Sequence, residues 1–302
     1  WHFSSIMPLS HLRFALLAGL AASALAPVQA ASSAAEVAPA PKVAPKAAKA
    51  VEPALTWRDV TTWGVEGRGF GELERMRWFD RFPAEAKGKV TDAVWNLSRD
   101  SAGMMVRFKT DAKTIWAHYT LLKENLAGAN MTRIGASGLD LYARDDRGLW
   151  RWVGVTRPDQ KIVRQEIVGG LAPGYREYAV YLPLYNGIEA LAFGVPPEAR
   201  FETLAPREEK PIVFYGTSIT HGASASRPGM VHTAILGRRF DRPVINLGFS
   251  GNGRMDTAVG DLLIKIDDIE GSYINLEELG GHGEFPSTQA LSQVYSCFGY
   301  TN

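Results

Sequence analysis

The sequence of 302 residues is poor in cysteine and has almost no excess charge. Its single cysteine, Cys297, cannot form an intrachain disulfide, and a structural zinc site made of several cysteines is excluded as well. The 33 Lys and Arg residues nearly balance the 32 Asp and Glu residues, which leaves a formal net charge of +1. Nucleic acid is therefore not an expected partner, and we expect neither a metal nor another cofactor.

Long apolar runs are also scarce. Residues 14–26 are apolar, but a helix that crosses a bilayer needs about 20 such residues. A short basic head with His11 and Arg13 precedes this run, and Val28 and Ala30 place small residues at positions −3 and −1 of a cleavage site. The pattern predicts a signal peptide over residues 7–30, a bacterial protein that is periplasmic or extracellular, and no membrane contact after cleavage. Residues 1–6 precede the first methionine, so we take them to lie upstream of the start codon.

Residues 31–55 consist almost entirely of Ala, Pro, Lys and Val. Such a segment cannot bury enough apolar surface to offset the loss of chain entropy on folding. We expect an extended, disordered linker.

Residues 56–205 read as an all-β region. Apolar and polar side chains alternate, as in Ile115, Ala117 and Tyr119, which is typical of strands with one buried face. Strands are predicted at residues 104–109, 115–121, 139–143, 149–155, 161–167, 177–184 and 189–195, with turn signals such as Asn186-Gly187 between them. Many short strands at this spacing suggest a β-sandwich, which we expect to fold as a separate unit.

The following segment has a strand, helix, strand, helix pattern. Strands are predicted at residues 212–215 and 244–247, and helices at residues 230–240 and 255–266. Such strands pair in parallel, and a site then lies beyond their carboxyl ends. Ser218 and Gly251 follow the two strands, so they could supply a nucleophile and an oxyanion hole. The alternative for Ser218 is a simple helix cap.

Two motifs in this segment resemble those of the SGNH or GDSL hydrolases. Gly216-Thr217-Ser218-Ile219-Thr220 is similar to the nucleophile block, with Thr217 in place of the usual Asp, and Asn246-Leu247-Gly248-Phe249-Ser250-Gly251-Asn252 is similar to the second block. The resemblance covers residues 210–263 and stops there. It implies that Ser218 is the nucleophile and that the N–H groups of Ser218 and Gly251 bind the oxyanion. It also implies a flavodoxin-like α/β domain over residues 210–302, which would be incomplete.

Gly138-Leu139-Asp140-Leu141-Tyr142 resembles the signature of the GxDLY domain, which precedes SGNH hydrolase domains in bacterial proteins. This resemblance implies a jelly-roll-like sandwich and esterase activity on acyl groups linked to carbohydrates. The expected fold class is thus α+β multidomain, a sandwich followed by a partial α/β domain. Trp150 and Trp152 share one strand face and could stack on sugar rings, although packing within the protein is favoured. Asp140 is expected at a turn or interface, not as a catalytic acid.

The general base that such a serine needs is missing from its usual place. SGNH hydrolases carry it in a C-terminal D-x-x-H block, which this sequence lacks. His282 is the only downstream histidine and thus the candidate base, although Leu279 stands where the paired Asp should be. His118, His221 and His232 fit the role poorly. The third block, G-x-N-D, is also missing, although residues 273–276 could form a strand that carries an asparagine.

Only 84 residues follow Ser218, which is short for a doubly wound domain. The simplest explanation is a reading frame lost near residue 264, and the chain as written is then expected to show little or no esterase activity. Two functions remain open. One is a secreted serine esterase that hydrolyses acyl, for example acetyl, esters on carbohydrates or another small ester substrate. The other is a catalytically incomplete carbohydrate-binding module attached to a degenerate hydrolase remnant. The sequence indicates neither the acyl group, the sugar nor the oligomeric state.

Overall fold

The computed structural model describes residues 53–266 and 271–274. The predicted signal peptide, nearly all of the linker, His282 and Cys297 lie outside these residues. No helix in the described part of the chain has the length and apolar character needed to cross a bilayer.

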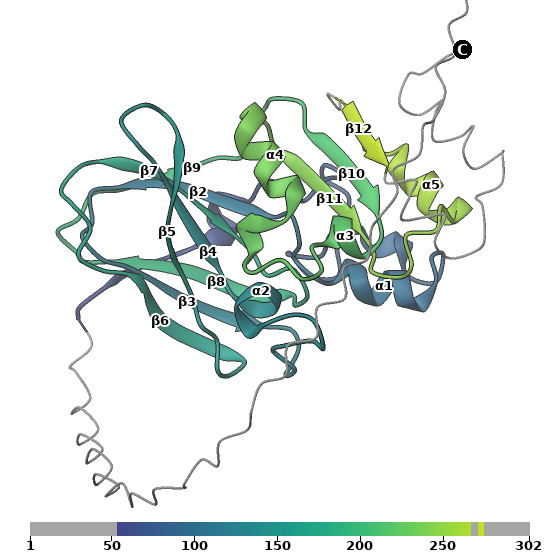
Figure 1. Ribbon diagram of the computed structural model, residues 1–302, viewed down its shortest axis with the longest axis horizontal. Coiled ribbons are helices and arrows are strands. Elements are labelled where there is room, and N and C mark those ends of the chain that lie inside the picture. Colours follow the sequence, from purple (N-terminus) through teal and green to yellow (C-terminus); the bar gives the residue numbers. More distant parts are fainter. Residues whose placement is uncertain (1–52, 267–270, 275–302) are drawn as a thin grey trace, which may run out of the picture. The chain divides into compact units, whose positions relative to one another are not determined.

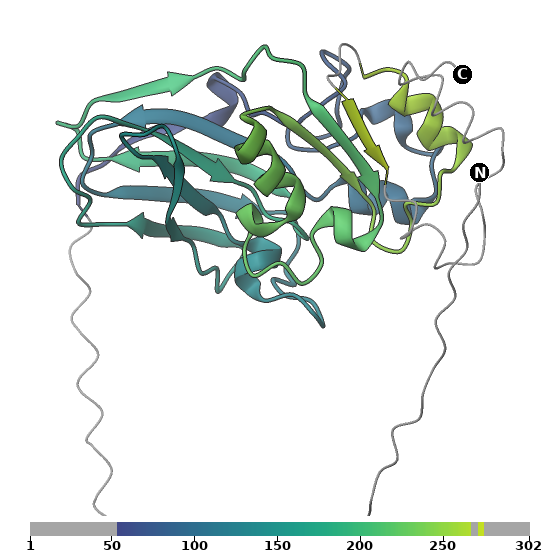
Figure 2. The same ribbon diagram turned by 45° about the horizontal axis from the view of Figure 1, so that its top comes forward.

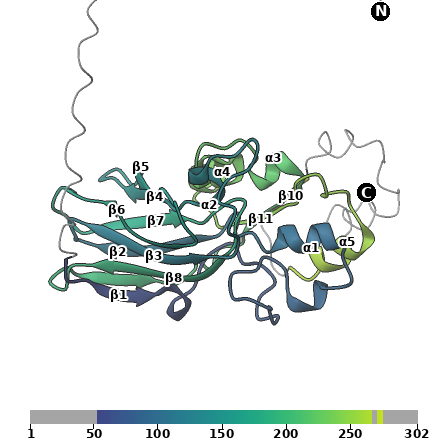
Figure 3. The same ribbon diagram turned by 90° about the horizontal axis from the view of Figure 1, so that it is seen from below.

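The described chain begins with a sandwich of two antiparallel sheets (Figure 1). One sheet has the strand order β1, β8, β3, β6, and the other has the order β5, β4, β7, β2, β9. The first sheet consists of β1 (Thr56–Asp59), β8 (Ile188–Val195), β3 (Ile115–Leu121) and β6 (Ile162–Val168). The second consists of β5 (Trp150–Val155), β4 (Asp140–Arg144), β7 (Arg176–Tyr181), β2 (Met105–Thr110) and β9 (Phe201–Leu204). Figure 3 shows the two sheets stacked face to face.

The sandwich core follows from the alternation in the sequence. Along β3 every second side chain is buried, and the side chains between them are half-buried, as the period of two predicts. Phe108 lies at the centre of the core, with ring centroids 4.8 Å from Phe201 and 5.1 Å from Phe193. The predicted strands are confirmed, with ends that differ by at most three residues, whereas β1 and β9 were not predicted.

A short parallel sheet follows, with the strand order β11, β10, β12. It consists of β11 (Val244–Gly248), β10 (Ile212–Gly216) and β12 (Gly271–Ile274). Numbered within this region, the order is 2-1-3, which is how a flavodoxin-like sheet begins. The expected fold class, a sandwich followed by an α/β region, is confirmed.

Two helices of this region are shorter than predicted. Helix α4 (His232–Phe240) starts after a 3₁₀ turn at Pro228–Met230, and α5 (Thr257–Leu263) starts after Met255, whose φ of +61° is not helical. Strand β12 was expected two residues later. Asn275, the asparagine expected on it, lies outside the described residues.

The expectation of an all-β region is wrong for the segment between β1 and β2. This segment contains α1 (Asp92–Ser98), which begins where the Thr91 hydroxyl accepts a hydrogen bond from the Val94 N–H. Phe70, Phe82 and Val94 are buried, and they belong to the core of the parallel sheet instead of the sandwich core. The α/β region therefore takes part of its core from residues that precede the sandwich strands.

The outer face of the five-stranded sheet packs against the α/β region (Figure 2). Tyr142 and Tyr181 of this sheet form one apolar cluster with Ala234 of α4. Beside the cluster, Arg207 contacts Glu66 at 2.7 Å and Asp241 at 2.9 Å. The sheet is consequently buried on both faces.

The shared core predicts an effect of Phe82→Ala. Phe82 is fully buried against Phe70 and Phe249, so its truncation should lower the free energy of unfolding by about 3 to 5 kcal/mol. Hydrogen exchange should rise most in β10 and β11. Leu73→Ala, at a side chain that is 39% exposed on the same segment, is the control and should change little. Faster exchange in β2 and β7 only would contradict the assignment of this segment to the α/β core.

Candidate active site

Ser218 lies where β10 turns into a short helix. Strand β10 ends at Gly216, and α3 (Ser218–His221) follows after a single residue. Ser218 is half-buried, whereas its neighbours Thr217 and Thr220 are fully buried. The helix ends at Gly222, whose φ of +113° is left-handed and whose N–H donates to the Ser218 carbonyl at 3.0 Å.

Gly251 lies in the loop that follows β11. Gly216 pairs with Gly248 in the parallel register, so Ser218 and Gly251 lie in neighbouring loops at one edge of the sheet. The Phe249 N–H donates to the Gly216 carbonyl at 2.9 Å, and a Cβ at Gly253 would lie 2.0 Å from that carbonyl oxygen. The close approach holds the two loops together. Gly251 itself has a φ of +70° with open space beside it.

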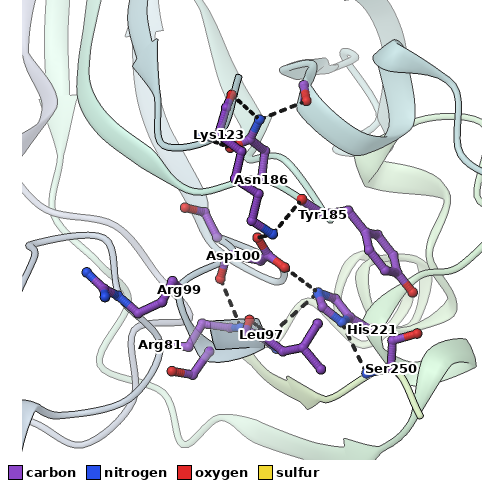
Figure 4. A network of polar contacts seen from close by, with 12 residues as sticks. Arg81, Leu97, Arg99, Asp100, Lys123, Tyr185, Asn186, His221 and Ser250 are labelled. Atoms are coloured by element: carbon purple, nitrogen blue, oxygen red, sulfur yellow. Dashed lines mark hydrogen bonds and ion pairs between the residues drawn. The ribbon is translucent and has the colours of Figure 1, made fainter. Parts of the chain in front are cut away.

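His221, three residues after Ser218, is fully buried, and its contacts do not suit a general base. Its Nδ1 accepts a hydrogen bond from the Ser250 N–H at 3.4 Å, and its Nε2 lies 3.6 Å from the Asp100 carboxylate (Figure 4). Burial, with the nearby Arg81 and Lys123, lowers the pKa of His221 well below its usual value. Nδ1 is therefore occupied by the Ser250 N–H, Nε2 lies beside the Asp100 carboxylate, and the imidazole stays neutral.

The other described histidines lie elsewhere. His118, on β3, contacts the edge of Trp57 with a centroid distance of 5.8 Å. His232, on α4, contacts Phe214 with a centroid distance of 5.7 Å. Within residues 53–266 and 271–274 no histidine takes the place of the base, and the candidate His282 lies outside them. In the same described part of the chain, no three His, Cys, Asp or Glu side chains converge as a metal site would require.

Arg81 is a fully buried cation that sequence reasoning did not identify. Its guanidinium donates to the carbonyls of Asp100, Leu97, Asn246 and Gly248 at 2.6 to 3.0 Å. Burial lowers the pKa of Arg81 to about 10, so the side chain remains charged at neutral pH. No sequence signal marks it, because its partners are backbone carbonyls from distant segments.

Asn246, the first residue of the second block, also connects neighbouring elements through its side chain. Its side-chain amide donates to the Thr220 carbonyl at 2.6 Å and to the Thr233 hydroxyl at 3.1 Å, while its Oδ1 accepts from the Gly248 N–H at 2.9 Å. The fully buried side chain thus connects β11 to α3 and α4 and shapes the start of the Gly251 loop.

Asp140 is the interface residue that the sequence predicted. Its carboxylate accepts hydrogen bonds from the Gly229 N–H at 2.8 Å and from the Trp152 indole at 2.9 Å, and Arg227 lies 3.4 Å away. Gly229 belongs to the connection between α3 and α4. Asp140 therefore attaches this connection to the sandwich.

Trp150 packs within the protein, whereas Trp152 is half-exposed. Trp150 lies against the interface cluster, and the Arg144 guanidinium sits 4.6 Å from the centre of its ring. Arg227 sits 4.9 Å from the centre of the Trp152 ring, although Trp152 is 51% exposed. Each ring thus has an arginine over one face, and the packing alternative holds for Trp150.

Two family models match consecutive parts of the chain. Residues 55–201 match GxDLY, described as the N-terminus of SGNH hydrolase-type esterases, and residues 209–274 match the GDSL-like lipase/acylhydrolase family. The second match corrects our expectation that the resemblance stops at residue 263. It includes β12, which pairs with β10.

Solved structures give the same result for the fold. A protein from Bacteroides ovatus described as a GDSL-like lipase has 29% sequence identity and a TM-score of 0.72, and the match covers 81% of this chain and 71% of that one. A salicylyl-acyltransferase from a tetracycline biosynthetic pathway has 16% identity and a TM-score of 0.63, with 80% and 68% covered. A family two carbohydrate esterase from Cellvibrio japonicus has 10% identity and a TM-score of 0.43, with 65% and 67% covered, and at that distance it bears on neither fold nor substrate. No curated protein matches significantly.

The surroundings of Asp140 predict how its contribution to stability depends on pH. Burial raises the pKa of Asp140 to about 6, above the value of about 3.9 in an unfolded chain. Between about pH 6 and about pH 4 the folded state keeps a proton that the unfolded state has released, so the contribution grows as the pH falls. The difference in unfolding free energy between wild type and Asp140→Asn should therefore increase by about 1 kcal/mol from about pH 7 to about pH 5.

Denaturant unfolding at several pH values measures this difference. Asp146→Asn, in the exposed turn between β4 and β5, is the matched control. A difference that shrinks toward low pH would show that Arg227 and the two N–H donors outweigh burial.

Proposed function

Because this chain belongs to the GDSL-like lipase/acylhydrolase family, we propose that it is a serine esterase with Ser218 as nucleophile. The observation that carries the proposal is the parallel register of β10 and β11. It places the half-buried Ser218 and the Gly251 loop side by side at one edge of the sheet. Ligands bind at this edge in open α/β sheets.

The proposed reaction is acyl transfer in two steps. The Ser218 Oγ attacks the ester carbonyl carbon while a base takes the hydroxyl proton, and the Ser218 and Gly251 N–H groups stabilise the oxyanion. The alcohol leaves with that proton, and an acyl-enzyme remains. Water then attacks the acyl-enzyme, so that the acid is released and the Ser218 hydroxyl is restored. For the base we propose His282 in place of the missing D-x-x-H histidine, so that the chain as written turns over esters, contrary to the expectation of little or no activity.

The proposed substrates are acyl esters, acetyl esters among them, on carbohydrates. The GxDLY resemblance implies this class, and the signal-peptide pattern of residues 7–30 supports export to the periplasm or the medium. The alternative, a carbohydrate-binding module without activity, is less well supported. Trp150 and Trp152, which would stack on sugars, have arginines on one ring face each.

Hydrolysis of short-chain aryl esters and acetylated sugars by the full chain tests the proposal. Ser218→Ala should reduce the rate at least about 10³-fold, because it removes the atom that becomes acylated. Ser226→Ala is the matched control, since Ser226 is an exposed serine on the loop after α3, and it should leave the rate unchanged. Turnover that survives Ser218→Ala, or a wild-type chain that neither hydrolyses these esters nor reacts with a fluorophosphonate, would overturn the proposal.

A second variant tests the base. If His282 removes the Ser218 proton, His282→Ala should abolish turnover while leaving the thermal unfolding midpoint unchanged. The residual rate should be about 10³ to 10⁴ over water, which an oxyanion hole and binding alone provide. Full turnover by His282→Ala would show that another group is the base.

A further inference from the structure

A buried polar network runs from the sandwich side of the protein to the Gly251 loop (Figure 4). Its central side chain is His221, which the reaction proposed above does not use. The imidazole is fully buried, and a buried polar ring is costly unless its nitrogens have partners.

The contact with the Ser250 N–H indicates the tautomer of the ring. Nδ1 lies 3.4 Å from the Ser250 amide nitrogen, whose hydrogen points at it, so Nδ1 must be the acceptor and carry no proton. In a neutral imidazole the proton then sits on Nε2, which faces the Asp100 carboxylate at 3.6 Å. The Ser250 N–H that His221 holds lies one residue before Gly251.

Asp100 is fixed from the sandwich side. The Lys123 ammonium, just after β3, contacts its Oδ1 and also donates to the Tyr185 carbonyl at 3.1 Å. The second oxygen, Oδ2, is buried and has no hydrogen bond within the described residues, so it is left to face the His221 Nε2–H. The Nη2 of Arg81 lies 3.5 Å from the same Nε2, and this second cation further disfavours a charged imidazole.

Tyr185 supports the other side of the ring. It lies on the connection between β7 and β8, and its ring stacks on His221 with a centroid distance of 4.2 Å and an interplanar angle of 12°. Its hydroxyl donates to the Ser218 carbonyl at 3.5 Å. One sandwich residue thus touches both His221 and the backbone of the serine.

We propose that His221 is a positioning residue: held by Asp100 and Tyr185, its Nδ1 fixes the Ser250 amide and with it the Gly251 oxyanion loop. Residues of the sandwich then support the candidate active site through Asp100 and Tyr185. The effect on rate rests on the proposed esterase function. The hydrogen bond and its effect on the loop do not depend on that function.

Hydrogen exchange of the full chain tests the contact without any substrate. His221→Phe keeps a ring stacked on Tyr185 but removes the acceptor, so exchange of the Ser250 amide should rise about tenfold. His221→Asn is the matched variant, because its Oδ1 lies close to where Nδ1 was, and it should keep most of the protection. Amides of β2 and β7 should not change. Exchange at Ser250 that is equal in wild type and the Phe variant would overturn the proposal.

A measurement on the wild type covers the case in which the Phe variant does not fold. Nitrogen NMR of the His221 ring should show a neutral imidazole protonated on Nε2 only, unchanged from about pH 8 to about pH 5. A proton on Nδ1, or a charged ring in that range, would overturn the proposal.

Activity adds a separate readout. In the folded Phe variant kcat should fall about 10- to 100-fold with KM nearly unchanged, and binding of a boronic acid that mimics the tetrahedral intermediate should weaken in parallel. His221→Asn should recover most of this loss. A Phe variant with unchanged kcat but a loosened loop would overturn the catalytic consequence. A wild type without activity would refute the proposed function, and the exchange result would still decide the role of His221.

Discussion

The arrangement of this protein depends on one buried cation, Arg81. Its guanidinium joins carbonyls of the segment around α1 to the carbonyls of Asn246 and Gly248 in β11, which lie 165 and 167 residues after Arg81 in the chain. Removing a charge from water costs several kcal/mol, and here the cost is offset by four hydrogen bonds from a charged donor together with the nearby Asp100 carboxylate. Without Arg81, the carbonyls of Asn246 and Gly248 would be buried without these partners. The start of the Gly251 loop would then lose its support.

Contacts other than those of Arg81 also join the two regions. Residues before the sandwich strands supply Phe70 and Phe82 to the α/β core, and α4 covers the outer face of the five-stranded sheet. Asp140, in the motif that names the front domain, holds the connection between α3 and α4. The Ser218 turn and the Gly251 loop are thus supported by contacts from both regions.

Local patterns predicted most of the strands and helices, because the spacing of apolar residues follows the buried face of each element. The alternation in β3 and the apolar run of β10 are examples. The sequence also placed Ser218 and Gly251 after parallel strands. The prediction for residues 70–98 was wrong for two reasons. A helix as short as α1 has too few turns for its periodicity to be recognised. The residues next to Phe82 in the sequence also do not show which of the two cores Phe82 joins.

By itself the sequence determined the order of the two regions, most of the strands of each and the positions of the two loops beyond β10 and β11. Those features arise from local propensity and from the short range of a βαβ connection. Only the tertiary structure decided what surrounds the loops. From the sequence His221 fits the role of a base poorly, and in the structure packing by Tyr185, Asp100 and Arg81 makes it a buried, neutral acceptor. The physical reason is that burial and charge contacts between residues far apart in the chain set the protonation state, and sequence spacing carries no record of them.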